Sequence, residues 1–151
     1  MPRNKINQLN WGAEQRSSFI EFRVFWHGRI NRADLMDTFG ISLQQASIDL
    51  SRYADQWPQN IVYDRSQRAY VQGQAFKPCF FTPSAEDYLS RLRAVDQGLV
   101  SREQSWISVF PSYAATPMPA RGVAPETLRD VLVVQSRMIT FPLSARPCSW
   151  Q

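Results

Sequence analysis

The sequence predicts a mainly α-helical chain with a small β hairpin, which is an α+β fold class. Apolar residues recur at helical spacing along most of the chain, and residues 31–53 contain two short helices of this kind on either side of a glycine. Soon after them, two β-rich runs at residues 60–63 and 68–71 enclose a polar turn, as in a hairpin. We expect the remainder to form a helical connector and dimerisation region.

Size and composition indicate an ordinary folded protein. With 151 residues, the chain is long enough for one domain, or for one small domain with an extension. Its 44% hydrophobic and 20% charged residues are typical of soluble globular proteins. No apolar run approaches the roughly 18 residues of a membrane helix, and the N-terminus lacks a signal-peptide core, so we expect a cytoplasmic protein without a membrane partner.

The charge of the chain permits a nucleic-acid partner without requiring one. The net charge is +4 and the pI is about 9.4. Only Lys5 and Lys77 among the 17 basic residues are lysine. Arginine suits bidentate contacts to phosphate or guanine, although a GC-rich genome would produce the same bias. The two cysteines, Cys79 and Cys148, are too far apart to form a recognisable metal or disulfide motif, so we expect neither a metal site nor a cofactor.

The first predicted helix covers residues 12–28 and ends at Gly28. Its aromatic stripe comprises Phe19, Phe22 and Trp26. This spacing indicates core packing. We expect the solvent side of the helix to carry Arg16, Glu21 and Arg23.

Two shorter helices follow, joined by a turn. Asn31 is the expected N-cap of the first, and Gly40 stands where a positive φ ends it. Ser42 is the expected N-cap of the second, which should run to about residue 55, before Trp57 and Pro58. Its inward positions are Ala46, Leu50 and Tyr53. A short helix, a glycine turn and a second helix with a free outer face form the layout of a helix-turn-helix.

The outer face of that second helix has an unusual composition. It carries Gln44, Gln45, Ser47, Ile48, Ser51 and Arg52. Glutamine can bond adenine, serine can meet several base edges, and isoleucine can contact the methyl group of thymine. Ser42 can donate to a phosphate at the helix N-terminus. An ordinary polar helix face remains the alternative.

The hairpin after this pair predicts the winged form of a helix-turn-helix. Arg65 lies in its turn, residues 64–67, and Arg68 directly follows it, so both could reach a phosphate or the minor groove. The alternative is that these two arginines are only solvated surface residues without a DNA contact. Arg32 and Arg52 are further candidates for phosphate contacts.

Beyond residue 76 the pattern predicts a connector. A Pro-broken apolar segment leads to a helix that starts near Ser84. Its stripe comprises Tyr88, Leu89, Leu92 and Val95. This stripe could pack on the first helix or on a second chain, and we assign it to dimerisation. We also expect a short helix at residues 98–106, a helix from Pro125, and a strand from Met138.

Residues 42–53 resemble the recognition helix of DeoR-type winged helices, including the Asp49-Leu50 pair, but they depart from it at Gln45 and Ile48. Residues 11–53, 63–71, 76–95 and 105–113 resemble more closely the WYL-domain transcriptional regulators of bacterial phage-defence operons, of the BREX- and CBASS-associated kind. This resemblance covers nearly the whole chain.

The resemblance implies a homodimeric repressor of a phage-defence operon. It would bind an inverted repeat in double-stranded DNA, at promoters that include its own. It divides the chain into a winged helix-turn-helix at 1–76, a linker with bridging helices at 77–124, and the helix and first strand of a truncated WYL domain at 125–151. Whether the chain is a fragment or a naturally short regulator stays open. The Trp-Tyr-Leu core is absent, so we expect no small-molecule ligand.

Two other classes of function compete with this interpretation. A winged helix that binds protein instead of DNA is the alternative, and gel-shift titration separates the two. We do not expect an enzyme, because the single histidine, His27, has no carboxylate pair, phosphate loop or Cys/His cluster beside it.

Overall fold

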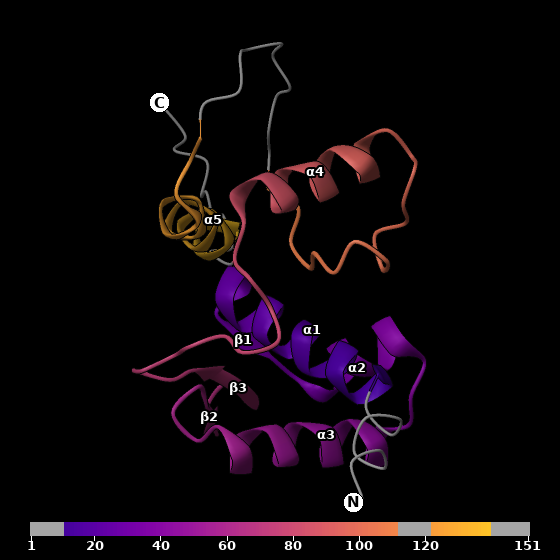
Figure 1. Cartoon of the computed structure of the whole chain (residues 1–151), viewed down its shortest axis with the longest axis vertical. Helices are drawn as coiled ribbons and strands as arrows, with labels where there is room; N and C mark the ends of the chain where they lie inside the picture. Colours follow the sequence, from indigo (N-terminus) through magenta and orange to yellow (C-terminus); the bar gives the residue numbers. More distant parts are fainter. Residues whose placement is uncertain (1–10, 112–121, 140–151) are drawn as a thin grey trace, which may run out of the picture.

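The computed structural model describes residues 11–111 and 122–139 (Figure 1). The elements in chain order are α1 (Trp11–His27), β1 (Arg29–Ile30), α2 (Arg32–Phe39), α3 (Leu43–Gln56), β2 (Ile61–Asp64), β3 (Ala69–Gln72), α4 (Ala85–Asp96) and α5 (Pro125–Ile139). The predicted α+β class, helical with a small β wing, is confirmed.

Helix α1 lies at the centre of the fold. Figure 1 shows α2 and α3 on one side of it and α4 on the other. Two buried clusters meet on α1. The first joins Phe19, Ile20 and Val24 to Leu35, Ala46, Leu50 and Tyr53. The second joins Phe22, Phe25 and Trp26 to Tyr88, Leu92 and Leu132. The predicted aromatic stripe is therefore core, as expected.

The predicted solvent side of α1 is wrong for Glu21 and Arg23, which are 0% and 6% exposed. The carboxylate of Glu21 accepts hydrogen bonds from the Tyr53 hydroxyl at 2.7 Å and from the backbone N–H groups of Cys79 and Phe80 at 2.9 and 2.7 Å. Arg23 forms an ion pair with Asp34. A charged group can be buried when such partners replace water. These partners are remote in sequence, so helical periodicity cannot reveal them.

The helix-turn-helix forms as predicted. The side chain of Asn31 accepts from the Asp34 N–H at 3.0 Å, and the Asp34 carboxylate accepts from the Asn31 N–H at 2.8 Å, which makes a reciprocal capping box. Gly40 ends α2 with φ of 63°. Ser42 caps α3 by accepting from the N–H of Gln45 at 3.1 Å. The inward positions of α3 are buried, which leaves its opposite face to solvent.

The sheet contains one strand that the sequence did not predict. In the order β1-β3-β2, β1 pairs antiparallel with β3, placing Arg29 opposite Val71. A strand of two residues is too short to show a period. After β3 the backbone passes so close to residue 59 that a Cβ on Gly73 would lie 2.0 Å from the carbonyl oxygen of Gln59. Only glycine allows this approach.

The C-terminal part corrects two further predictions. Residues 97–106 form turns instead of the expected short helix, and Gly98 and Trp106 both have positive φ, at 68° and 69°. Helix α5 continues through Met138 to Ile139, where a strand was expected to begin. Extending a helix needs no partner, whereas a lone strand does. The remainder of the expected strand lies outside the described residues.

Candidate nucleic-acid interface

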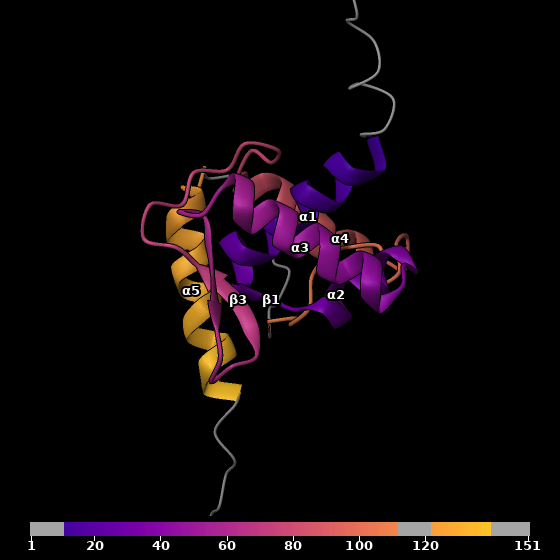
Figure 2. The ribbon, with the colours of Figure 1, turned by 90° about the horizontal axis from the view of Figure 1, so that it is seen from below.

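The outward face of α3 gathers the predicted base-reading residues. In Figure 1, α3 lies at the edge of the molecule, on the far side from α4, and Figure 2 looks onto it from below. Gln44, Ile48 and Ser51 are exposed, while Gln45 and Ser47 are half-buried. A shallow groove on this face is lined by Ser47, Ile48, Ser51, Arg52, Asp55 and Gln56. Burial of Ala46, Leu50 and Tyr53 fixes which side of α3 faces outward.

Internal hydrogen bonds already engage two of these residues. The Gln45 Nε2 atom donates to Asp49 Oδ1 at 3.0 Å, and Ser47 Oγ donates to the carbonyl of Leu43 at 2.9 Å. Gln44 and Ser51 are exposed and have no such bond in the described part of the chain. The outer face therefore contains some polar side chains that internal hydrogen bonds hold in place and others that have no such bond.

Sequence reasoning missed three residues of this region. Leu43 is 53% exposed in the first turn of α3, where helix-turn-helix proteins contact base edges. Asp49 is buried, and Arg16 of α1 donates to its Oδ2 through Nε at 2.6 Å. The Asp-Leu pair in the sequence marks Asp49, but no local signal connects it to Arg16, which lies 33 residues away.

The turn between β2 and β3 is organised by Asp64. Its Oδ1 accepts from the Ser66 hydroxyl at 2.6 Å and from the Ser66 N–H at 2.8 Å, and its Oδ2 accepts from the amide of Gln67. The Ser66 hydroxyl, followed by the other donors, holds the pKa of Asp64 below its usual value. Arg65 and Arg68 are exposed on this turn, and Arg68 has φ of 51°.

The remaining predicted contacts come from separate elements. Arg32, in the first turn of α2, is exposed. The hydroxyl oxygen of Ser42 accepts from the N–H of Gln45, and its hydroxyl proton remains able to donate. Figure 2 shows the β2–β3 hairpin beside α3 and running crosswise to it.

The stripe assigned to dimerisation is divided by the fold. Tyr88 and Leu92 are 1% and 3% exposed and pack on α1 within the same chain. This burial corrects the prediction that both residues contact a second chain. Leu89 is 41% exposed, and Val95 is half-buried. Helix α5 adds Val131 and Val134, which are 52% and 57% exposed.

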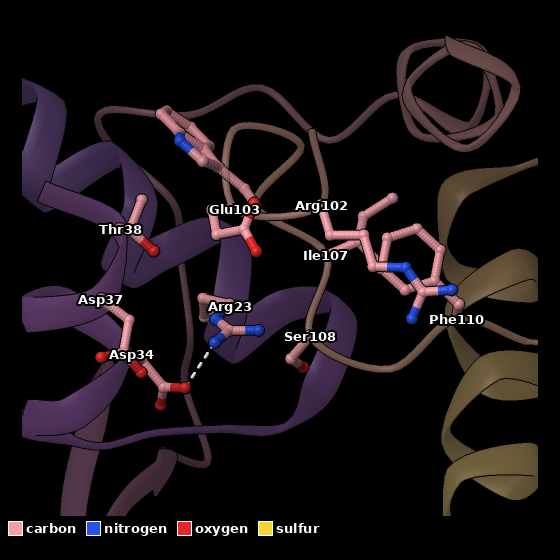
Figure 3. A pocket seen from close by; sticks show the side chains of 10 residues that line it. Arg23, Asp34, Asp37, Thr38, Arg102, Glu103, Ile107, Ser108 and Phe110 are labelled. Atoms are coloured by element: carbon pink, nitrogen blue, oxygen red, sulfur yellow. Dashed lines mark hydrogen bonds and ion pairs between the residues drawn. The ribbon is translucent and has the colours of Figure 1, made fainter. Parts of the chain in front are cut away.

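A second hollow, of about 200 Å³, lies between α1, α2 and residues 102–110 (Figure 3). Its charged lining residues are Arg23, Asp34, Asp37, Arg102 and Glu103. Figure 3 shows the ion pair of Arg23 with Asp34 at its wall. The lining combines charges of both signs.

His27 lies among aromatic rings at the end of α1. It packs against the rings of Phe22 and Tyr88, with centroids 6.3 Å away in each case. Burial, helped by the charge of Arg23, lowers the pKa of His27 to about 3. Across residues 11–111 and 122–139, no group of three His, Cys, Asp or Glu residues could hold a metal ion. None of the helices described is long and apolar enough to cross a membrane.

The fold is that of a winged helix-turn-helix protein. Helices α2 and α3 pack on α1 and leave the outer face of α3 free, and the β2–β3 hairpin lies beside α3. Residues 12–94, more than half of the chain, match the family model of the BrxR transcriptional regulator winged helix-turn-helix domain. The chain belongs to this family. The match confirms the predicted family of defence-associated winged-helix regulators, which are transcriptional regulators and not enzymes. It extends past the predicted domain boundary at residue 76 into α4.

Curated relatives from several bacteria share one description, DNA-binding transcriptional repressor CapW. The chain is 36% identical over 126 residues to the DNA-binding transcriptional repressor CapW of Stenotrophomonas maltophilia, covering 83% of this chain and 42% of that protein. It is 48% identical over 85 residues to CapW of Escherichia coli strain KTE188, covering 56% and 28%. For CapW of Pseudomonas aeruginosa the identity is 44% over 95 residues, covering 62% and 32%. The chain thus spans less than half of each relative's length.

Proposed function

We propose that this chain is a DNA-binding transcriptional repressor that inserts α3 into the major groove. One observation carries the proposal: the solvent face of α3 is rich in neutral hydrogen-bonding side chains, while the opposite side is closed by the core. Gln44, Ile48 and Ser51 are free to meet base edges. The names of the CapW relatives support the same function.

Phosphate contacts in this proposal come from several elements around α3. Ser42 donates its hydroxyl proton at the positive end of the helix dipole. The exposed arginines proposed for these contacts are Arg32, Arg52, Arg65 and Arg68. Such contacts set the register of the protein on the duplex, whereas the α3 face carries sequence selectivity.

The finer proposal concerns the operator. A homodimer would read an inverted repeat, with half-sites about 34–36 Å apart or a multiple of that distance. Blocking a promoter, its own included, would repress a phage-defence operon. Because Tyr88 and Leu92 are buried in their own chain, the exposed Leu89 is the residue of the predicted stripe best placed to contact a second chain.

A titration with labelled DNA from upstream of the gene tests the proposal at physiological salt. The expected result is a complex that unlabelled operator displaces and scrambled DNA does not. Equal competition by both DNAs, or no complex, would overturn it. In that case the exposed Val131 and Val134 would favour the alternative, a module that binds protein.

Light scattering tests the dimer separately. We expect wild-type protein to form a dimer at micromolar concentration, and Leu89→Asp to weaken it. Leu99→Asp is the matched control, since Leu99 is 73% exposed but lies in a turn outside the stripe. A monomeric wild-type protein would refute dimerisation without affecting DNA binding by one copy.

A further inference from the structure

The side chain of Gln45 is held in one orientation by its own helix. A glutamine amide has an oxygen that accepts and a nitrogen that donates, and a freely rotating amide can present either one to DNA. Gln45 is not free in this way, because its Nε2 donates to Asp49 Oδ1 at 3.0 Å. The two residues stand four apart on α3, so they are neighbours on the helix surface.

Asp49 determines which end of the amide turns toward it. An ionised carboxylate only accepts hydrogen bonds, so the amide oxygen of Gln45 cannot face it without repulsion. Arg16 keeps this carboxylate in place, with Nε donating to Oδ2 at 2.6 Å while Nη2 lies 3.4 Å from Oδ1. The side chains of Arg16 and Asp49 are only 18% and 6% exposed, so water competes weakly for these bonds.

We propose that Arg16 and Asp49 orient Gln45 so that its amide oxygen faces the major groove and selects a base with an exocyclic amino group. This inference rests on the proposed function. Adenine N6 and cytosine N4 supply such a donor, whereas guanine O6 and thymine O4 are acceptors that the oxygen repels. Adenine also offers N7 to the second amide proton, so adenine is the preferred base. Arg16 and Asp49 are positioning residues that do not themselves touch DNA.

Selection from a randomised DNA library, using the whole chain, tests the orientation. With wild-type protein we expect one position per half-site to be enriched in adenine or cytosine. After Asp49→Asn, the new amide can accept from Arg16 and donate to Gln45. This turns the Gln45 nitrogen outward, and the preference at that position should change to guanine or thymine. Asp96→Asn makes the same chemical change at an exposed carboxylate of α4, outside the α3 face, and should leave the preference as it was.

A second measurement avoids any effect of Asp49→Asn on folding. 2-Aminopurine lacks the 6-amino group of adenine but still pairs with thymine. Replacing the selected adenine by 2-aminopurine should lower wild-type affinity about 5- to 150-fold, the range for loss of a bidentate base contact. In Gln45→Met, which keeps the length of the side chain but not its polar end, DNA with 2-aminopurine and DNA with adenine should bind alike.

The outcomes separate the two proposals. If wild-type protein enriches no DNA sequence, the proposed function fails. If it enriches a sequence but Gln45→Met retains the 2-aminopurine penalty, Gln45 is not the reader and the inference is overturned while DNA binding stands. If Gln45→Met loses the penalty but folded Asp49→Asn keeps the wild-type base preference, the orienting role of Asp49 is overturned.

Discussion

Glu21 provides the sharpest test of how this fold is held together. Its carboxylate is fully buried and joins three parts of the chain: α1, the end of α3 through the Tyr53 hydroxyl, and the segment before α4 through the N–H groups of Cys79 and Phe80. Removing it by Glu21→Ala leaves these donors without their acceptor and opens a cavity beside Tyr53.

The expected cost of Glu21→Ala follows from these contacts. Hydrogen bonds to a charged group are worth about 1.5–3 kcal/mol each, but three donors that share one acceptor are not additive. We therefore expect a loss of about 4 kcal/mol in the free energy of unfolding, less than the sum of the separate bonds. For a chain of this size, this loss corresponds to a decrease in Tm of roughly 8–16 °C.

Urea denaturation followed by circular dichroism measures this change. Glu14→Ala is the matched control, because Glu14 is an exposed carboxylate on the same helix and its loss should change stability by less than about 0.5 kcal/mol. Glu21→Gln retains one acceptor oxygen and should lie between the two. If Glu21→Ala is as stable as Glu14→Ala, the carboxylate does not tie the segment to the core as described.

Three further predictions concern DNA and pH. Gln44→Ala should lose about 1–3 kcal/mol of binding to the cognate operator and relax preference at one base pair; wild-type affinities for both operator and scrambled DNA would exclude Gln44 as a reader. Arg65→Ala should weaken binding to all sequences alike and reduce the slope of log K against log salt by about one unit, whereas a sequence-dependent loss would contradict a phosphate contact. Burial lowers the pKa of His27 to about 3, so below about pH 6.5 the unfolded chain takes up a proton that the folded chain does not. Stability should therefore decrease with falling pH by up to about 1.4 kcal/mol per unit, and His27→Gln should remove this contribution in urea denaturation at pH 7.5, 6 and 5, while an unchanged slope would show that His27 is not responsible.

The winged helix-turn-helix could be predicted from sequence because its signals are local. Asn31, Gly40 and Ser42 act on backbone groups within a few residues, and the buried side of α3 follows from a spacing of three to four residues. The same local pattern identifies the outward face that we propose for DNA contact. These features depend on the chain only over short distances, so a single sequence contains them.

The tertiary structure alone decided which charged residues are buried and what they hold. Glu21 and Arg23 have the sequence signature of surface residues, and only the packing of remote segments on α1 places them inside. Asp49 likewise acquires Arg16 as a partner across 33 residues, and this contact orients Gln45. The sequence by itself determined the two helices of the helix-turn-helix, their caps and the face of α3. Long-range packing, whose contacts leave no periodic trace, decided how the polar groups on that face are presented.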